Sequence, residues 1–243
     1  SLLVLLVACG GDGDDKDAAP SSTTTTTDAP STTSSTTTTT EAPVVEEGKP
    51  ATVALEWVTA IADGDDARAQ ELVSPRSMAA IGGVESWPEY EIPLAEGWGA
   101  WGHGGVEVIT ADITDGVWAV TFHGEISQEG PPAESWSTLL VVATEAGLRV
   151  EPFLDLGTVE PGPESGAAIE PTHEFSAFVP GGREVALLVD GELVDTTVES
   201  ADGDMQRAFA EHTLDPGLHG FAIVVWNESG AMARSVVYTV PND

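Results

Sequence analysis

The sequence predicts an α+β domain, in which helices pack on an antiparallel sheet, followed by an all-β sandwich. A disordered stalk is expected in front of both. Three observations support this fold class. Helical periodicity occurs only within residues 50–80, short apolar runs separated by turns continue to the end of the chain, and residues 10–49 are rich in Ser, Thr and Pro. Helices that precede a series of neighbouring strands are typical of α+β proteins.

The first nine residues predict an export signal and a lipid anchor. Residues 2–8 are apolar and lead to Cys9, the only cysteine of the chain. The run Leu6-Val7-Ala8-Cys9 resembles a bacterial lipobox, in which diacylglycerol is attached to the cysteine and the signal peptide is cut just before it. The resemblance implies an exported lipoprotein, held at the outer face of the cell membrane by acyl chains such as palmitate on Cys9. The alternative is an ordinary cleaved signal followed by an unrelated cysteine.

Residues 10–49 are predicted to form a disordered tether. Threonine-rich runs alternate with prolines there, and residues 10–42 have no apolar periodicity. Such a segment cannot bury enough apolar surface to offset the entropy that is lost on ordering. Its composition is typical of mucin-like stalks.

The chain is strongly acidic, with 41 Asp and Glu against eight Lys and Arg. Both lysines, Lys16 and Lys49, belong to the predicted stalk, and residues 50–243 hold 33 acidic residues and six arginines. This balance excludes a general electrostatic site for nucleic acid and repels anionic membrane surfaces, so we expect membrane contact only through the lipid. Two interpretations of the acidity stay open, namely binding of cations or a basic partner, and solubility in salty surroundings.

The folded part is predicted to begin with two helices. Val53, Trp57 and Ile61 recur at i, i+4 and i+8 and form one apolar stripe. The run Asp63-Gly64-Asp65 ends this helix, and Asp65 is placed to cap the next one. The predicted helical segments are residues 51–63, residues 66–73 and a short turn at residues 76–80.

Four strands are expected after these helices. In the second of them, Trp118, Val120 and Phe122 share one face, whereas Ala119, Thr121 and His123 share the other. Turn sequences such as Thr114-Asp115-Gly116 separate the strands, which indicates an antiparallel meander. The predicted strands are residues 106–112, 117–125, 138–143 and 148–153.

The opening of the folded part is similar to that of NTF2-like domains. The resemblance rests on the helix over residues 53–62, the turn Asp63-Gly64-Asp65 and the second helix over residues 67–75, and it covers about residues 50–157. It implies an α+β cone, in which a curved antiparallel sheet wraps around the helices. Some members of this family are enzymes with an Asp/His pair in the cone, and others bind or scaffold. No catalytic residue of those enzymes maps onto this chain.

Residues 158–165 are predicted to be a linker, and residues 166–243 an all-β sandwich, because short strands recur at a spacing of about ten residues. Asp190-Gly191 between two apolar runs predicts a two-residue hairpin turn. The predicted strands are residues 172–179, 184–189, 192–197, 205–213, 218–226 and 231–240.

The last strands are similar to those of bacterial immunoglobulin-like domains. The similarity lies in the runs Leu214-Asp215-Pro216-Gly217-Leu218-His219 and Trp226-Asn227-Glu228-Ser229-Gly230, and it spans about residues 166–241. It implies an immunoglobulin-like β-sandwich that acts as a spacer or adhesion module.

A glycine-rich loop and one strand residue are the candidate ligand-binding positions. Trp98, Trp101 and His103 lie within residues 96–105, where two indoles and an imidazole suit a sugar ring or an apolar ligand. The alternative is that Trp98 and Trp101 close the open end of the cone as part of its core. His123 either lines a cavity with Glu125 or is simply exposed on the surface.

The sequence predicts no metal site, no cofactor and no catalytic residue. Its five histidines form no His-x-x-x-His or His-Glu-x-x-His pair, and Gly-x-Ser-x-Gly, phosphate-binding and EF-hand motifs are absent. We therefore expect a membrane-anchored envelope lipoprotein that binds a ligand or a protein partner without catalysis. The alternatives are an enzyme in the cone, with His123 or His103 as general base, and a purely structural spacer.

Overall fold

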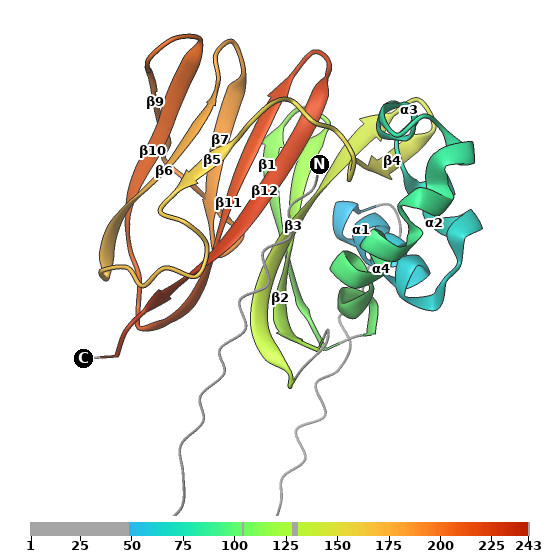
Figure 1. The fold of residues 1–243 in the computed structure, drawn as a ribbon, viewed down its shortest axis with the longest axis horizontal. Coiled ribbons are helices and arrows are strands. Elements are labelled where there is room, and N and C mark those ends of the chain that lie inside the picture. The colour runs from blue at the N-terminus through green and yellow to red at the C-terminus, as the bar shows by residue number, and fades with distance from the viewer. Residues whose placement is uncertain (1–48, 104, 128–130, 243) are drawn as a thin grey trace, which may run out of the picture. The chain divides into compact units, whose positions relative to one another are not determined.

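The computed structural model describes residues 49–103, 105–127 and 131–242. Helices come first and antiparallel strands follow (Figure 1). Cys9 and the predicted stalk up to residue 48 lie outside the described residues. No helix among the described residues has the length and apolarity to span a membrane. The helices are α1 (Pro50–Asp63), α2 (Asp66–Leu72), α3 (Pro75–Ala80), η1 (Val84–Glu89), α4 (Glu91–Trp98) and η2 (Gly99–His103), where η marks 3₁₀-helices.

Helices α1 and α2 form where the apolar stripe and the capping residues predict them. Gly64 follows α1 with φ 69°, and its N–H donates to the carbonyl oxygens of the last turn. Glycine takes this left-handed conformation without steric cost, which ends the helix. The Asp65 carboxylate then accepts a hydrogen bond from the Arg68 N–H at 3.1 Å and caps α2.

The segment between α3 and the first strand is helical, which the sequence analysis did not predict. Pro88, Pro93 and Gly97 interrupt the periodicity there. The short helices instead bury Trp87, Leu94 and Trp101. Helices of this length owe their stability to tertiary packing more than to the propensity of their residues.

The strands within the described residues form three antiparallel sheets of four strands each. Sheet A has the order β1-β2-β3-β4, with β1 (Glu107–Thr114), β2 (Val117–Ile126), β3 (Ala133–Thr144) and β4 (Gly147–Val150). Sheet B has the order β5-β6-β10-β9, with β5 (Glu160–Gly162), β6 (Thr172–Pro180), β10 (Met205–Thr213) and β9 (Thr197–Ser200). Sheet C has the order β12-β11-β7-β8, with β12 (Gly230–Val240), β11 (Gly217–Asn227), β7 (Glu184–Val189) and β8 (Glu192–Val194).

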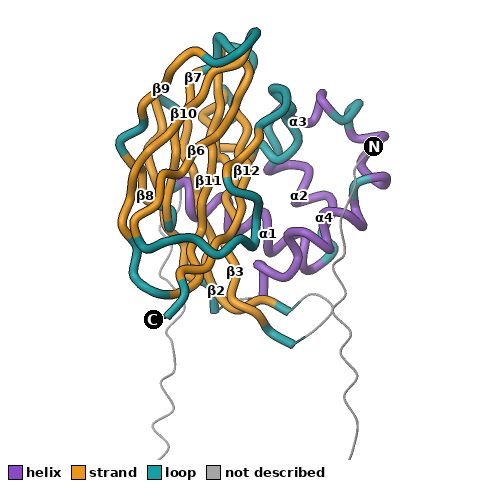
Figure 2. Tube along the Cα trace, turned by 60° about the vertical axis from the view of Figure 1, so that its left-hand side comes forward, coloured by secondary structure: helices purple, strands orange, loops and turns teal. Residues whose placement is uncertain are grey.

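The helices and the three sheets are stacked as four layers in the order helices, sheet A, sheet C, sheet B (Figures 1 and 2). One apolar core lies in each of the three spaces between layers. The core between the helices and sheet A is rich in aromatic side chains, and Trp57, Trp87, Trp101 and Phe122 are fully or almost fully buried in it.

Sheet A packs against sheet C through small and aliphatic side chains. Ala119 and Leu140 of sheet A meet Leu188 and Val224 of sheet C in this core. The approach is close, because a Cβ atom added at Gly220 would lie only 2.6 Å from Cγ of Trp136. The face of β2 that carries Ala119, Thr121 and His123 is therefore covered by the C-terminal half of the chain.

Sheet C is buried on both faces, which explains its unusual strand sequences. Residues 220–225 of β11 and residues 186–189 of β7 are all buried, with no alternation between apolar and polar positions. A strand covered on one face only would alternate with a period of two. On its other face, sheet C packs against sheet B around Phe175, Phe221 and Tyr238.

Tyr238 ties the segment before β6 to the last strand. Its hydroxyl donates a hydrogen bond to the carbonyl oxygen of Pro163 at 2.6 Å. Burial raises the pKa of Tyr238, because the phenolate would lose its hydration in the core.

Two further segments differ from the sequence-based expectation. Residues 158–165, expected to be a linker, contain β5, which pairs with β6. The hairpin at Asp190-Gly191 is confirmed, with φ values of 51° and 80°, but its second strand is shorter than expected. The chain leaves sheet C after Val194 and enters sheet B as β9, so the strand predicted at residues 192–197 is divided between two sheets.

Candidate functional site

The two tryptophans of the predicted binding loop lie in the core between the helices and sheet A. Trp101 is 2% exposed, and its ring centroid is 6.0 Å from that of Phe122. Trp98 is half-buried, with its ring 5.7 Å from Trp57 and 6.2 Å from Phe122. This placement agrees with the packing alternative for both residues. His103, at the end of η2, is exposed to solvent.

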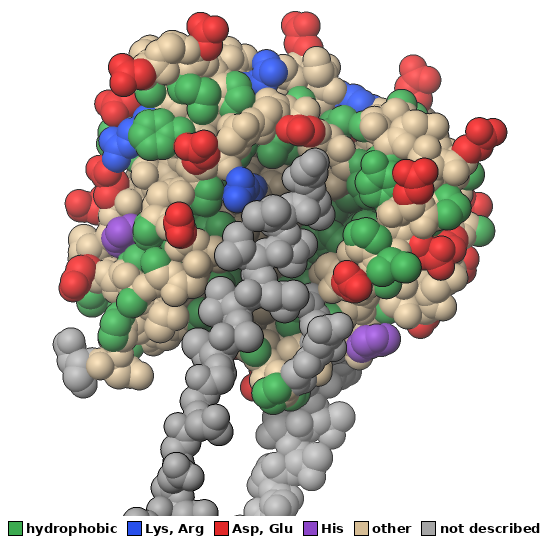
Figure 3. All heavy atoms as spheres, viewed as in Figure 1, with side chains coloured by type: hydrophobic (Ala, Val, Ile, Leu, Met, Phe, Trp, Pro, Cys, Tyr) green, Lys and Arg blue, Asp and Glu red, His purple; other side chains and the backbone are tan. Residues whose placement is uncertain are grey.

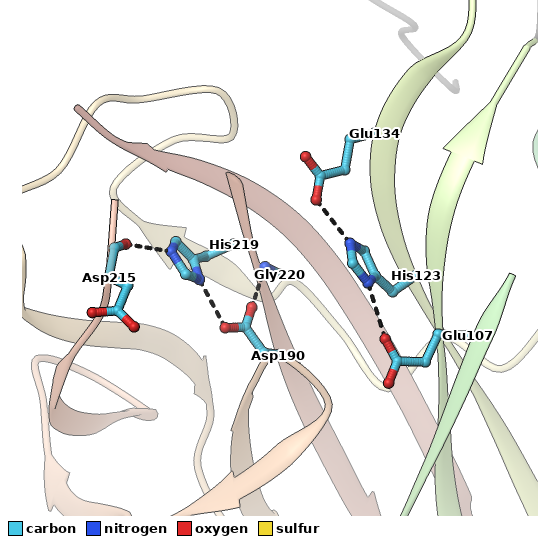
Figure 4. A network of polar contacts seen from close by, with 7 residues as sticks. All are labelled: Glu107, His123, Glu134, Asp190, Asp215, His219 and Gly220. Carbon is cyan, nitrogen blue, oxygen red and sulfur yellow. Dashed lines mark hydrogen bonds and ion pairs between the residues drawn. The ribbon is translucent and has the colours of Figure 1, made fainter. Parts of the chain in front are cut away.

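His123 does not face the core between the helices and sheet A. It lies on the opposite face of β2 from Phe122, at the side of sheet A that meets sheet C. Its ring stacks on Trp136 with centroids 3.8 Å apart and an interplanar angle of 12°. Its Nε2 is 2.9 Å from Glu134 Oε1, and its Nδ1 is 3.3 Å from Glu107 Oε2 (Figure 4). Its carboxylate contacts are therefore with these two residues on the neighbouring strands instead of the expected Glu125.

His219 forms a second histidine–carboxylate contact, on sheet C (Figure 4). Its Nδ1 is 2.7 Å from Asp190 Oδ2, and its Nε2 is 2.8 Å from the carbonyl oxygen of Asp215. The other carboxylate oxygen of Asp190 accepts the Gly220 N–H at 2.9 Å. These bonds hold Asp190 at its positive φ, which costs a non-glycine residue about 1 kcal/mol or more.

Both ring nitrogens of each histidine already contact a carboxylate or carbonyl oxygen. A general base needs a nitrogen that reaches the substrate proton. Within the described residues, no group of three or more His, Cys, Asp and Glu side chains is arranged to hold a metal ion. The contacts of His123 lie within sheet A, and those of His219 link β11 to the β7–β8 turn and to the segment before β11.

The outer face of sheet B carries the arrangement best suited to binding a partner. Register places Glu160, Phe178, Arg207 and Glu199 opposite one another across the four strands, in one row on the face turned away from sheet C. Together with Glu174 and Phe209, these residues are called the sheet-B face below. Phe178 is 40% exposed, although sheet surfaces in contact with water usually carry polar residues at such positions.

Arg207 is the centre of the sheet-B face. Its guanidinium is ion-paired with Glu174 and, at 3.3 Å, with Glu199, and it lies 4.6 Å above the ring of Phe209. The hydrogen bond from Arg207 to Glu174 is the main cause that raises the pKa of the guanidinium. The planar group is thus held in place by two carboxylates and an aromatic ring.

A groove of about 730 Å³ runs along this face. It is lined by the row itself and by Met205 and Asp202 from the start of β10 and the turn before it. Glu160 and Asp202 have no ion-pair partner among the salt bridges of the described residues, so the groove keeps an excess of negative charge.

Sequence reasoning missed this face because a row across four strands exists only after the register is known. One signal was present in the sequence. In residues 172–179, Phe175, Ala177 and Val179 mark the buried positions, and Phe178 interrupts the polar residues of the other face. A large apolar residue at an outward position points to a contact surface.

No family model matches the chain, and no curated protein matches it either. Among solved structures, part of the chain is similar to the endo-β-1,4-mannanase from Thermotoga petrophila, with 16% identity over 37% of this chain and 21% of that chain and a TM-score of 0.29. The tandem immunoglobulin domains of titin are also similar, with 10% identity over 59% of this chain and 79% of that chain and a TM-score of 0.26. Overlaps this weak carry no argument about function.

Proposed function

We propose that the protein is a non-catalytic binding module of the cell envelope, which recognises a basic, partly apolar protein surface through the sheet-B face. The single observation behind this proposal is the row Glu160–Phe178–Arg207–Glu199, which sets an exposed aromatic ring beside a fixed guanidinium. Arginine and aromatic residues are enriched at the energetic centres of protein interfaces.

Charge favours a basic partner. Arg207 is already neutralised by Glu174 and Glu199, whereas Glu160 and Asp202 leave negative charge at the groove. Acidic side chains are dispersed over the surface seen in Figure 3, and Lys and Arg are few there. Such a surface attracts cationic partners and repels acidic ones, which sets the rate and the selectivity of binding more than its strength.

We also infer that the C-terminal half is an immunoglobulin-like sandwich. When its strands are lettered in chain order, sheet B has the order A-B-E-D and sheet C the order G-F-C-C′, which is the arrangement of immunoglobulin domains. The layer of helices on a four-stranded antiparallel sheet supports the proposal of an NTF2-like N-terminal half.

The binding proposal is tested with two soluble peptides of equal length, one of alternating Lys and Leu and one of alternating Glu and Leu. Calorimetric titration of residues 49–243 is expected to show saturable binding of the lysine peptide only. Phe178→Ala removes the exposed ring and is expected to weaken that binding about tenfold, the effect of losing about 1.4 kcal/mol at an interface.

The matched control for this experiment is Ile92→Ala on α4, which also removes an exposed apolar side chain but lies outside the sheet-B face. It is expected to leave the affinity unchanged. Equal affinity for the two peptides, or an equal loss in both variants, contradicts the proposal.

The lipid anchor at Cys9 is proposed from the sequence alone. Two or three acyl chains hold a protein on a membrane firmly, because each buried methylene contributes about 0.8 kcal/mol. When the gene is expressed in a bacterium that processes lipoproteins, the native chain is expected in the detergent-rich phase after phase separation. Cys9→Ser is expected to move the protein to the aqueous phase or the medium. Retention of the variant in the detergent phase contradicts acylation at this residue.

A further inference from the structure

A second groove, of about 370 Å³, lies where four parts of the chain meet. Helix α3, the β1–β2 turn, the end of β3 and the β11–β12 turn each contribute to it. Its size is at the lower end of the range of about 300–1,000 Å³ that is usual for small-molecule sites, which occur often where two structural units join. The side chains that matter here are Arg76, Thr114, Asp115, Trp226 and Asn227.

Arg76 is held in place by a buried carboxylate on the protein side of the groove. Its Nε donates to Glu151 Oε1 at 3.0 Å, and the side chain of Glu151 is completely buried. Glu151 is fixed in turn by the Ser74 hydroxyl at 2.8 Å and the Ala231 N–H at 3.2 Å. Because 43% of the Arg76 side chain remains exposed, one edge of the guanidinium is anchored while the group still reaches the groove. A donor fixed before binding loses less entropy when a ligand arrives.

The turn between β11 and β12 supplies a second fixed polar group and an aromatic ring. The Oδ1 atom of Asn227 accepts the Ser229 N–H at 2.8 Å, which leaves its side-chain amide N–H groups as donors for a ligand. Trp226, the preceding residue, is half-buried and packs against the core between sheets A and C. The indole is therefore held at the groove by its neighbours.

The charges in the groove select a neutral ligand. The positive charge of Arg76 is balanced by the buried carboxylate of Glu151, and the exposed Asp115 adds a negative charge that repels anions. What remains is a set of planar donors and acceptors, with a threonine hydroxyl, beside one indole ring. Planar amide, carboxylate and guanidinium groups pair with neighbouring hydroxyls, and an indole offers an apolar face for C–H groups.

From this combination we propose that the groove at Arg76, Asp115, Trp226 and Asn227 binds a neutral pyranose sugar. The site is separate from the sheet-B face, since it shares no residue with it, and it goes beyond the protein-binding function proposed above. The protein would then have a second kind of ligand, a glycan whose terminal hexose unit occupies this groove.

The test is saturation-transfer NMR on residues 49–243 with glucose, galactose, mannose and N-acetylglucosamine. At least one of the four is expected to receive saturation from the protein. Asp115→Asn removes the anionic acceptor in an exposed turn, and Arg76→Lys keeps the ion pair with Glu151 but loses the planar group. Each variant is expected to weaken the binding at least fivefold, with an unchanged melting temperature for Asp115→Asn.

The controls show whether the sugar binds at this groove and whether the site prefers a neutral sugar to an anion. Asp112→Asn, an exposed change on β1 outside the groove, and Phe178→Ala on the sheet-B face are expected to bind the sugar like the native chain. Three results overturn the proposal. They are no saturation transfer to any of the four sugars, binding that is unaffected by both groove variants, and binding of glucuronate as strong as that of glucose, which shows an anion site instead.

Discussion

Replacement of Glu151 by alanine is expected to lower the free energy of unfolding by about 3 kcal/mol, because several buried or half-buried donors lose one acceptor together. The carboxylate accepts from the Ser74 hydroxyl, the Arg76 guanidinium and the Ala231 N–H. These donors come from the start of α3 and the start of β12, so the loss also loosens the junction between the two halves of the chain. Denaturant unfolding followed by circular dichroism measures the change.

Two variants sharpen this prediction. Glu151→Gln keeps the size of the side chain but places an N–H₂ group opposite hydrogen-bond donors. It is expected to lower the free energy of unfolding by less than Glu151→Ala does. Glu71→Ala removes a carboxylate that is ion-paired with Arg68 on the surface, and it is expected to change stability by no more than the error of measurement. Equal losses for Glu151→Ala and Glu71→Ala contradict the central role of the buried carboxylate.

Trp57→Ala is expected to have the largest effect of any single change, a loss of about 4 kcal/mol. Trp57 is fully buried on α1 and packs edge-on against Trp98, in the core between the helices and sheet A. The cavity left by an indole in such a core collapses only in part. A fall in the unfolding midpoint at an unchanged denaturant dependence is the expected observation.

Trp57→Phe separates packing from polarity at the same position. The indole Nε1 of Trp57 is buried without a hydrogen-bond partner among the described residues. An unsatisfied buried donor costs about 1–3 kcal/mol. Phenylalanine removes that donor and keeps most of the apolar surface, so a loss of about 1 kcal/mol or less is expected. If Trp57→Phe is as damaging as Trp57→Ala, the shape of the indole is what the core requires.

Local signals in the sequence predicted the elements that depend on neighbouring residues. The stripe of Val53, Trp57 and Ile61 with Gly64 after it predicts α1, and Asp190-Gly191 predicts the β7–β8 hairpin. The helices between residues 84 and 103 escaped prediction because prolines and glycines interrupt their periodicity and tertiary contacts of Trp87 and Leu94 stabilise them.

The candidate sites could be predicted only in part. For Trp98 and Trp101 the sequence allows both a binding platform and a core position, because the depth at which the loop lies depends on tertiary packing. The sheet-B face depends on the pairing of strands that are far apart in the chain, such as Glu160 with Phe178 and Arg207 with Glu199. Register of this kind is set by packing over the whole sheet.

One sequence pattern indicates the contact between sheets A and C. Residues 139–142 and 221–225 are apolar without a break, which is unusual for strands that face water on one side. Local sequence patterns do not connect two runs that lie so far apart in the chain. The observed layers explain them, since β3 and β11 are covered on both faces where they lie between other layers.

The four-layer stack has a consequence for how the chain reaches its native state. The Thr138 N–H bonds the Ser235 hydroxyl across 97 positions, and Glu151 bonds Ala231 across 80. Contacts so distant along the chain form slowly. During synthesis the N-terminal part of the chain is made first. The face of sheet A that packs on sheet C therefore stays exposed until β7, β11 and β12 have been synthesised. Repulsion between nascent chains with a formal net charge of −33 opposes their association during that interval.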